Sequence, residues 1–120
     1  MIMIQVSLGE LLDKITILNL KKRHCRDAAD LQFISDELGQ LLKVSAAQKL
    51  TPTLIDKCSS LGNINERIWN LENDIRSGSE NLYHVEVAFQ IRDLNDQRSA
   101  LKREINEIGC SQLTEVKVYD

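Results

Sequence analysis

The sequence predicts a mainly α-helical protein, an antiparallel four-helix bundle with a short two-stranded ribbon formed by the N- and C-terminal segments. Three observations lead to this fold class. Only one of the 120 residues is proline and five are glycine, so a sandwich with many turns is not expected. Long stretches carry apolar residues at spacings of three and four, the period of an α-helix. The length suits one hydrophobic core, and we expect a single domain over residues 1–120.

The N-terminal segment predicts a strand followed by a helix. β-Branched or similar apolar side chains recur at every second position, at Ile2, Ile4 and Val6, which is typical of a strand. Ser7 and Glu10 have the spacing of a capping box, which satisfies the free amides at a helix start. We therefore expect the first helix to begin near residue 8.

A second helix is expected after Asp27, a residue type that often caps helix N-termini. Apolar residues recur after it at helical spacing, at Leu31, Ile34, Leu38 and Leu41. Since no proline lies between the first two helices, the sequence leaves open whether they are separate or continuous.

The second half of the chain predicts two longer helices. Thr51 and Pro52 are suited to the N-cap and the first helical position, and Gly78 can end this third helix. A fourth helix is expected over roughly residues 81–108, with Gly109 after it. Residues 113–119 alternate like an edge strand, which we expect to pair with the N-terminal strand. The first and fourth helices would then be antiparallel, with facing residues whose numbers sum to about 116.

Arg98 is the clearest anomaly, because it occupies an apolar position of the fourth helix between Leu94 and Leu101. The expected register places Arg98 near Leu18, with Asp13 within reach. It also places Lys102 near Lys14 and Asn106 near Glu10. A polar cluster should therefore span three helices. Its members, our candidate ligand-binding residues, are Glu10, Asp13, Lys14, Asn65, Asn95, Arg98 and Lys102.

Two interpretations of this polar cluster remain open. In the first, the cluster is a structural ion network in which an acid such as Asp13 neutralises an interior arginine and fixes the helix register. In the second, Lys14, Arg98 and Lys102 exceed the nearby acids and leave donors free for a phosphate or carboxylate.

A catalytic role is the less favoured alternative, and the sequence identifies no catalytic residue. Helical pairs of carboxylates could hold magnesium, as in all-helical nucleotide pyrophosphohydrolases, but such pairs arise easily in a chain that is 28% charged. Chorismate mutase offers a fold-level analogy for a small helical enzyme acting on a dicarboxylate. We predict no metal and no cofactor. The carboxylate pairs are Glu10 with Asp13, Asp93 with Asp96, and Glu104 with Glu107.

A second polar group lies further along the third helix, where Glu72 and Arg76 follow Trp69 at helical spacing. The tryptophan either packs on the bundle edge or stacks on a ligand. The register places this group at the opposite end of the bundle from the first cluster, several helical turns from Arg98.

Charge and hydropathy restrict the partners. A net charge of −3 argues against nucleic-acid binding, which needs a concentrated basic surface. No apolar run reaches the ~20 residues of a membrane span, and the start lacks the features of a signal peptide, so we expect a cytoplasmic protein without membrane contact. Ile17 and Leu20 lie off the main apolar stripe of the first helix, which predicts a surface for a homodimer.

Three ordered motifs resemble a family of small bacterial proteins of unknown function. They are VSxGELxDKxTIL at residues 6–18, WxxExxIR at 69–76 and NDxRxxLKRxIN at 95–106. The family occurs alone or beside sugar-transfer and surface-polysaccharide proteins, so the resemblance implies a loose association with glycan metabolism and no established reaction.

We therefore expect a non-catalytic helical binding or interaction module, whose polar cluster takes a small anionic ligand such as a phosphorylated sugar or a nucleotide. The alternative is a small all-helical enzyme acting on a phosphorylated or dicarboxylate substrate.

Overall fold

The structure, a computed structural model, describes residues 2–78 and 81–109 and confirms a mainly helical protein with four helices. They are α1 (Leu8–His24), α2 (Ala28–Ala46), α3 (Pro52–Arg76) and α4 (Asn81–Ile108). None of the helices in the described part of the chain is both long and apolar enough to cross a lipid bilayer.

The helix starts follow from local capping. The side chains of Ser7, Asp27 and Thr51 each accept a hydrogen bond from the backbone amide three residues later. The cap at Asp27 answers the question that the sequence left open, because α1 and α2 are separate helices joined by residues 25–27. Gly78, just after α3, has a φ of +79°, a left-handed conformation that glycine adopts without strain.

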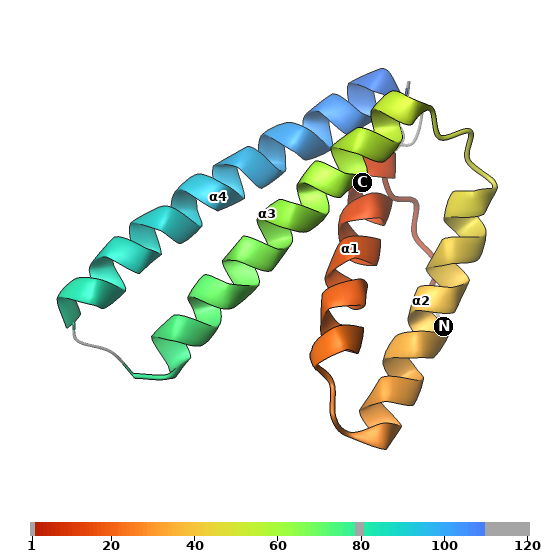
Figure 1. The fold of residues 1–120 in the computed structure, drawn as a ribbon. Coiled ribbons are helices and arrows are strands. Elements are labelled where there is room, and N and C mark those ends of the chain that lie inside the picture. Colours follow the sequence, from red (N-terminus) through yellow and green to blue (C-terminus); the bar gives the residue numbers. More distant parts are fainter. Residues whose placement is uncertain (1, 79–80, 110–120) are drawn as a thin grey trace.

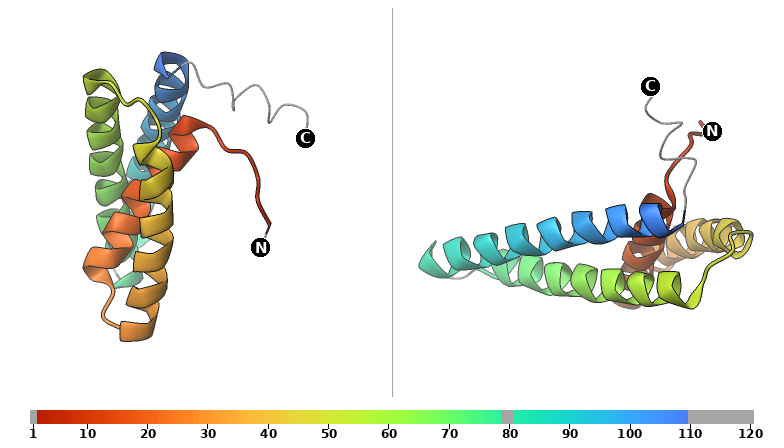
Figure 2. Two further views of the ribbon diagram at one scale, coloured as in Figure 1. Left: turned by 90° about the vertical axis from the view of Figure 1, so that its right-hand side faces the viewer. Right: turned by 90° about the horizontal axis from the view of Figure 1, so that it is seen from above.

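The helices form two antiparallel hairpins, α1 with α2 and α3 with α4 (Figure 1). The hairpins meet where α1 and α3 begin and α4 ends, and they diverge from there, so the molecule has the outline of a V. Figure 2 shows that α3 and α4 stay side by side along their length, while α1 and α2 lie only at the end of this hairpin where α3 begins and α4 ends. The four helices are therefore not aligned as in a regular bundle.

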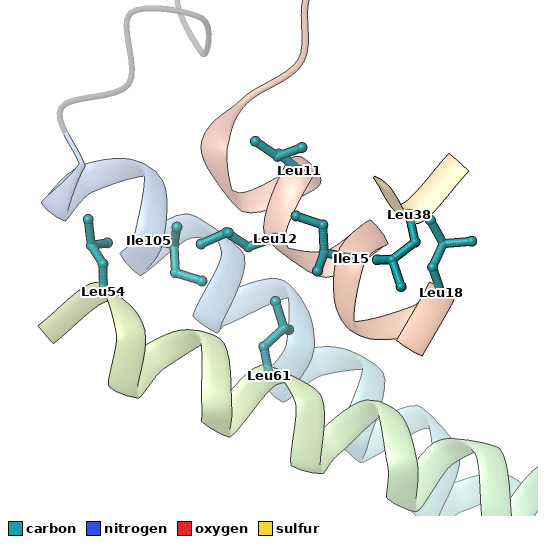
Figure 3. Packing of buried hydrophobic residues seen from close by; sticks show 8 residues of the cluster. All are labelled: Leu11, Leu12, Ile15, Leu18, Leu38, Leu54, Leu61 and Ile105. Atoms are coloured by element: carbon teal, nitrogen blue, oxygen red, sulfur yellow. The ribbon is translucent and has the colours of Figure 1, made fainter. Parts of the chain in front are cut away.

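The hydrophobic core fills the closed end of the V (Figure 3). Leucine and isoleucine side chains from all four helices contribute to it, and Leu61 and Ile105 are completely buried. The core cluster consists of Leu11, Leu12, Ile15, Leu18, Leu38, Leu54, Leu61 and Ile105. Because α3 contributes only Leu54 and Leu61, the part of α3 beyond residue 61 lies outside this cluster.

Gly9 sets the closest approach of α1 to α4. A Cβ atom at this position would lie 2.6 Å from the backbone oxygen of Lys102 and 3.0 Å from Oδ1 of Asn106. The Gly9 amide donates a hydrogen bond of 2.7 Å to that same asparagine oxygen. Between α3 and α4, Lys57 binds Glu104 at 2.7 Å. The lack of a side chain at residue 9 thus lets two helix backbones meet.

The structure does not support the predicted two-stranded ribbon. Residues 2–6 lead into the cap of α1 and form no strand with any part of the described chain. Ile2, Met3 and Ile4 are 91%, 87% and 78% exposed, so the alternating pattern that predicted a buried strand face has no packing partner among the described residues. The expected second strand, residues 113–119, lies outside the described residues.

Gly9→Ala should destabilise the fold by about 1 to 3 kcal/mol, because the added methyl group overlaps the α4 backbone and the two helices must separate. Urea unfolding followed by circular dichroism measures this change. Gly39→Ala is the matched control: the same substitution in α2 meets no atom within 4 Å and should stabilise the protein by about 0.5 to 1 kcal/mol. Equal effects of the two substitutions would contradict the close approach at Gly9.

Candidate functional site

Asp13 lies at the centre of the polar cluster. Its position on the core-facing side of α1 leaves the residue only 3% exposed, among the leucines that drive α1 into the core. Arg98 on α4 meets the carboxylate with two parallel bonds: Nε donates to Oδ1 at 2.9 Å and Nη2 donates to Oδ2 at 2.5 Å. This paired geometry is the strong form of an arginine–carboxylate interaction. Asp13 and Arg98 therefore join α1 firmly to α4.

Asn65 extends the network to α3. Its Nδ2 donates to Oδ1 of Asp13 at 2.9 Å and to Oγ1 of Thr16 at 2.7 Å. The Thr16 hydroxyl in turn donates to the backbone oxygen of Asp13 at 2.8 Å. Since Asn65 is only 5% exposed, these bonds satisfy an amide that would otherwise be costly to bury. Three helices thus meet at one carboxylate.

Lys102 and Glu10 form the outer part of the network, one turn further along α4 and α1. Nζ of Lys102 lies 2.6 Å from Oε1 of Glu10 and 3.6 Å from Oδ2 of Asp13. With Arg98 included, two cations face two carboxylates, and the network is neutral overall. The lysine and both acids therefore neutralise charges within the fold.

The pKa of Asp13 reflects a balance of opposing effects. Burial favours the neutral acid and raises the pKa of this carboxyl. Hydrogen bonds from Arg98 and Asn65, together with the charges of Arg98 and Lys102, outweigh burial and hold the pKa below its ordinary value of 3.8. Asp13 also raises the pKa of Arg98 above its ordinary range. Both partners are consequently ionised at neutral pH.

The predicted register of α1 and α4 is correct to within one residue near the end of α4 and wrong by about one turn further back along that helix. Asn106 binds Gly9, next to the expected Glu10, whereas Lys102 binds Glu10 in place of Lys14. Arg98 binds Asp13, which was expected within reach, and not Leu18. The prediction assumed two helices that stay aligned along their whole length. In the structure the two hairpins diverge from the end where α1 begins and α4 ends (Figure 1).

Two predicted members of the cluster lie outside the network. Lys14 points towards α2, where its Nζ lies 3.0 Å from Oε2 of Glu37, and its side chain is 58% exposed. Asn95 is half-buried on α4 and makes no side-chain hydrogen bond with any described residue. The remaining five predicted residues, Glu10, Asp13, Asn65, Arg98 and Lys102, come together in one network.

A cleft of about 200 Å³ opens beside the network, between the diverging ends of α1 and α3. Arg98 and Asn65 line the end nearest the core, and Glu72 and Arg76 line the opposite end. Apolar side chains of both helices complete the walls. These include Ile17, Leu20, Ile68 and Trp69. The two groups predicted to lie at opposite ends of a bundle therefore share one cleft, because α3 carries its residues along the open side of the V.

Trp69 separates this cleft from a shallower hollow around the end of α1. Its ring stacks on His24 with centroids 5.0 Å apart and an interplanar angle of 20°. Its Nε1 atom is buried and has no hydrogen-bond partner among the described residues. A buried donor without an acceptor costs about 1 to 3 kcal/mol of folding free energy.

Thr16 is a network residue that the sequence analysis missed. The signal was present: Thr16 follows Asp13 by three residues on the apolar side of α1 and is 9% exposed. Gly62 on α3 faces it, with space for a Cβ atom only 3.7 Å from the Thr16 methyl group. A polar side chain next to an interior acid, opposite a glycine, indicates a close helix contact.

The candidate metal ligands and the Cys58 nucleophile are not arranged for metal binding or nucleophilic catalysis in the described residues. Within residues 2–78 and 81–109, no three histidine, cysteine or acidic side chains are grouped to hold a metal ion. In the suggested magnesium pairs, Glu10 and Asp13 bind Lys102 and Arg98, and Glu104 binds Lys57. Burial raises the pKa of the Cys58 thiol, which disfavours the reactive thiolate.

Asp13→Asn should lower the free energy of unfolding at neutral pH by up to about 3 kcal/mol. This is the low end for breaking a buried ion pair, because the Arg98 side chain is 29% exposed and water can solvate it. The loss should shrink in acid: Asp13 stabilises the fold above pH 3.8, and this contribution disappears as the pH falls through its lowered folded pKa.

Urea unfolding at several pH values measures this effect. Asp56→Asn, an exposed site on α3, is the control and should change little. A loss of stability that is independent of pH in the Asp13 variant would contradict the lowered pKa.

Comparisons of the chain with protein-family models, curated proteins and solved structures find no match.

Proposed function

We propose that this protein is a non-catalytic helical binding module that takes a small anionic ligand, such as a phosphorylated sugar or a nucleotide, in the cleft between α1 and α3. The observation that carries the proposal is the position of Arg98, whose guanidinium binds Asp13 on one edge and lines the cleft. A cytoplasmic location, where phosphorylated metabolites are abundant, belongs to the same proposal.

The pair with Asp13 prepares Arg98 for a ligand. Nε and Nη2 are engaged, while Nη1 has no hydrogen-bond partner among the described residues. Because the guanidinium is planar and its orientation is fixed by two bonds, little conformational entropy is lost when the remaining N–H groups bind an anion. The site is thus organised before the ligand arrives.

The cleft also offers two arginine side chains to an anion. Arg98 and Arg76 both line it, although Asp13 neutralises the charge of Arg98 from behind and Glu72 lies near Arg76. Glu72 and Arg76 are 3.9 Å apart and exposed, so their mutual attraction is weak and leaves Arg76 available to a ligand. The indole ring of Trp69 forms part of the cleft wall.

Lys14 and Lys102 support this proposal less than the sequence led us to expect. Each has a carboxylate partner within 3.0 Å, Glu37 for Lys14 and Glu10 for Lys102. Asn95 lies one turn from Arg98 along α4, where it could extend the site. The proposed ligand-binding group is therefore centred on Arg98 and the cleft, and the lysines stabilise the helices that form it.

The three motifs that resemble the bacterial family converge on this region. Asp13 belongs to the first motif, Trp69 to the second and Arg98 to the third. The resemblance supports a shared role for the network and the cleft within that family.

The alternative, a small all-helical enzyme, has weaker support. A general base works best with a pKa near the working pH, whereas the pKa of Asp13 is lowered and both its oxygens accept hydrogen bonds. The geometry therefore favours binding over catalysis at this carboxylate.

A thermal-shift screen with inorganic phosphate, a hexose phosphate, a nucleoside monophosphate and a dicarboxylate tests the proposal. A ligand at 100 times its dissociation constant should stabilise the protein by about 2.7 kcal/mol, a shift of several degrees for a domain of this size. Arg98→Lys should abolish the shift, because lysine can still neutralise Asp13 but lacks the second edge of the guanidinium.

Arg103→Ala removes an exposed arginine of the same helix that does not line the cleft, and it should leave the shift unchanged. A full response in the Arg98→Lys variant, or no response to any of the four classes, would contradict the proposal.

A further inference from the structure

The part of the α3–α4 hairpin furthest from the core lacks a covering helix on one side. The core cluster takes Leu54 and Leu61 from α3 and Ile105 from α4, all near the closed end of the V. Beyond them, Val87 and Leu94 are buried on the same stripe of α4 as Ile105, the stripe that packs on α3. The open end of the hairpin is therefore a two-helix layer (Figure 1).

The uncovered side of the α3–α4 hairpin is the same side that α1 covers near the closed end of the V. On α4 the residues that bind α1 recur every four positions, at Arg98, Lys102 and Asn106. Nearer the start of α4, the residues on the same face of the helix are Asn95, Ile91 and Ala88. On α3, Asn65 binds α1, and its stripe continues outward. We call the continuation the open face: Trp69, Glu72 and Arg76 of α3 with Ala88, Ile91 and Asn95 of α4.

The open face has the composition of a helix-packing surface. Trp69, Ile91 and Asn95 are half-buried, Trp69 in part because His24 of α1 stacks on it, and Ala88 is small enough for another helix to approach closely. The only formal charges on the open face are those of Glu72 and Arg76. Few charges around a central tryptophan and isoleucine are characteristic of the buried centre of a protein interface.

We propose that a second copy of this chain covers the open face, so that the two α3–α4 hairpins form an intermolecular four-helix bundle. A two-fold dimer needs a surface that is complementary to itself, since each patch meets its own copy. Glu72 and Arg76 satisfy this condition: they carry opposite charges one turn apart. When two α3 helices meet antiparallel, Glu72 of one protomer faces Arg76 of its partner.

The exchange places Arg76 against the partner's Glu72, so that in the dimer the anion site of each protomer depends on Arg98. Within one chain Glu72 and Arg76 are 3.9 Å apart, with side chains 46% and 77% exposed. In the dimer each Arg76 has a carboxylate at an interface where water is partly excluded, which strengthens the interaction. The inner end of the cleft, at Arg98 and Asn65, stays within each protomer.

The proposed dimer surface differs from the one predicted from the sequence. Leu20, from which the sequence analysis inferred a dimer, is 2% exposed and is covered by its own chain, and Ile17 is half-buried. The diverging hairpins instead leave the α3–α4 layer available (Figure 1).

Light scattering and sedimentation over a range of concentrations test the dimer. The wild type should have the mass of two chains. Ala88→Arg should give the mass of one chain, because a long charged side chain prevents close helix packing.

Glu72→Arg should also dissociate the dimer by placing like charges opposite each other, and the double variant Glu72→Arg with Arg76→Glu should restore the dimer. Trp69 is the only tryptophan, so its fluorescence should change on dilution of the wild type and of every dimeric variant, and stay constant in the monomeric variants.

Arg67→Glu, an exposed charge reversal on α3 outside the open face, is the matched control and should remain dimeric. Circular dichroism verifies that every variant is folded. A monomeric wild type, a dimer that persists in Ala88→Arg, or a double variant that stays monomeric would overturn the proposal. The anion response of the monomeric Ala88→Arg variant is a separate readout, so the dimer and the ligand site can fail independently.

Discussion

The ion pair between Asp13 and Arg98 determines how the two hairpins are joined. A carboxylate that is 3% exposed must be neutralised, and in this fold its partners come from both α3 and α4. The bonds from Arg98 and Asn65 bring α4 and α3 to the same carboxylate of α1. The network therefore favours this arrangement of three helices, whereas leucine and isoleucine side chains alone would tolerate several.

The network contributes more to specificity than to stability. Well-packed apolar residues could replace a buried ion pair at little cost in stability, yet removal of one partner leaves a charge without compensation. Hydrogen bonds from Asn65 and Arg98 satisfy Asp13 so fully that its pKa is lowered despite burial. Close contacts support the same geometry: Gly9 brings α1 against the α4 backbone, and Gly62 faces Thr16. Small residues and a neutralised charge together fix the crossing of the helices.

The divergence of the hairpins creates the surfaces available for function. Because α1 crosses the second hairpin near the core, a cleft opens beside Arg98, and the outer parts of α3 and α4 lack a third helix (Figure 2). A regular bundle would bury both features. The same crossing leaves one edge of the Arg98 guanidinium at the cleft, which is where we propose that a small ligand binds, and leaves uncovered the helix face that we propose a second copy covers. Asp13 itself is held as an anion by its hydrogen-bond partners.

The sequence by itself determined the helices. Ser7, Asp27 and Thr51 cap them as expected, because capping depends on residues three positions apart. It also identified Arg98 as anomalous and predicted four of its neighbours in the network, since a polar residue in an apolar stripe needs partners that are polar as well.

Only the tertiary structure decided the register, the crossing angle and the cleft. Helical periodicity shows which side of a helix is apolar, but it does not show at what angle two apolar sides pack. For that reason the sequence did not predict that Lys14 binds Glu37 of α2 or that Leu20 is buried. It also did not predict that Arg76 and Arg98 line the same cleft. These features depend on contacts between residues far apart in the chain, where the packing of Gly9 against α4 and the neutralisation of Asp13 act together.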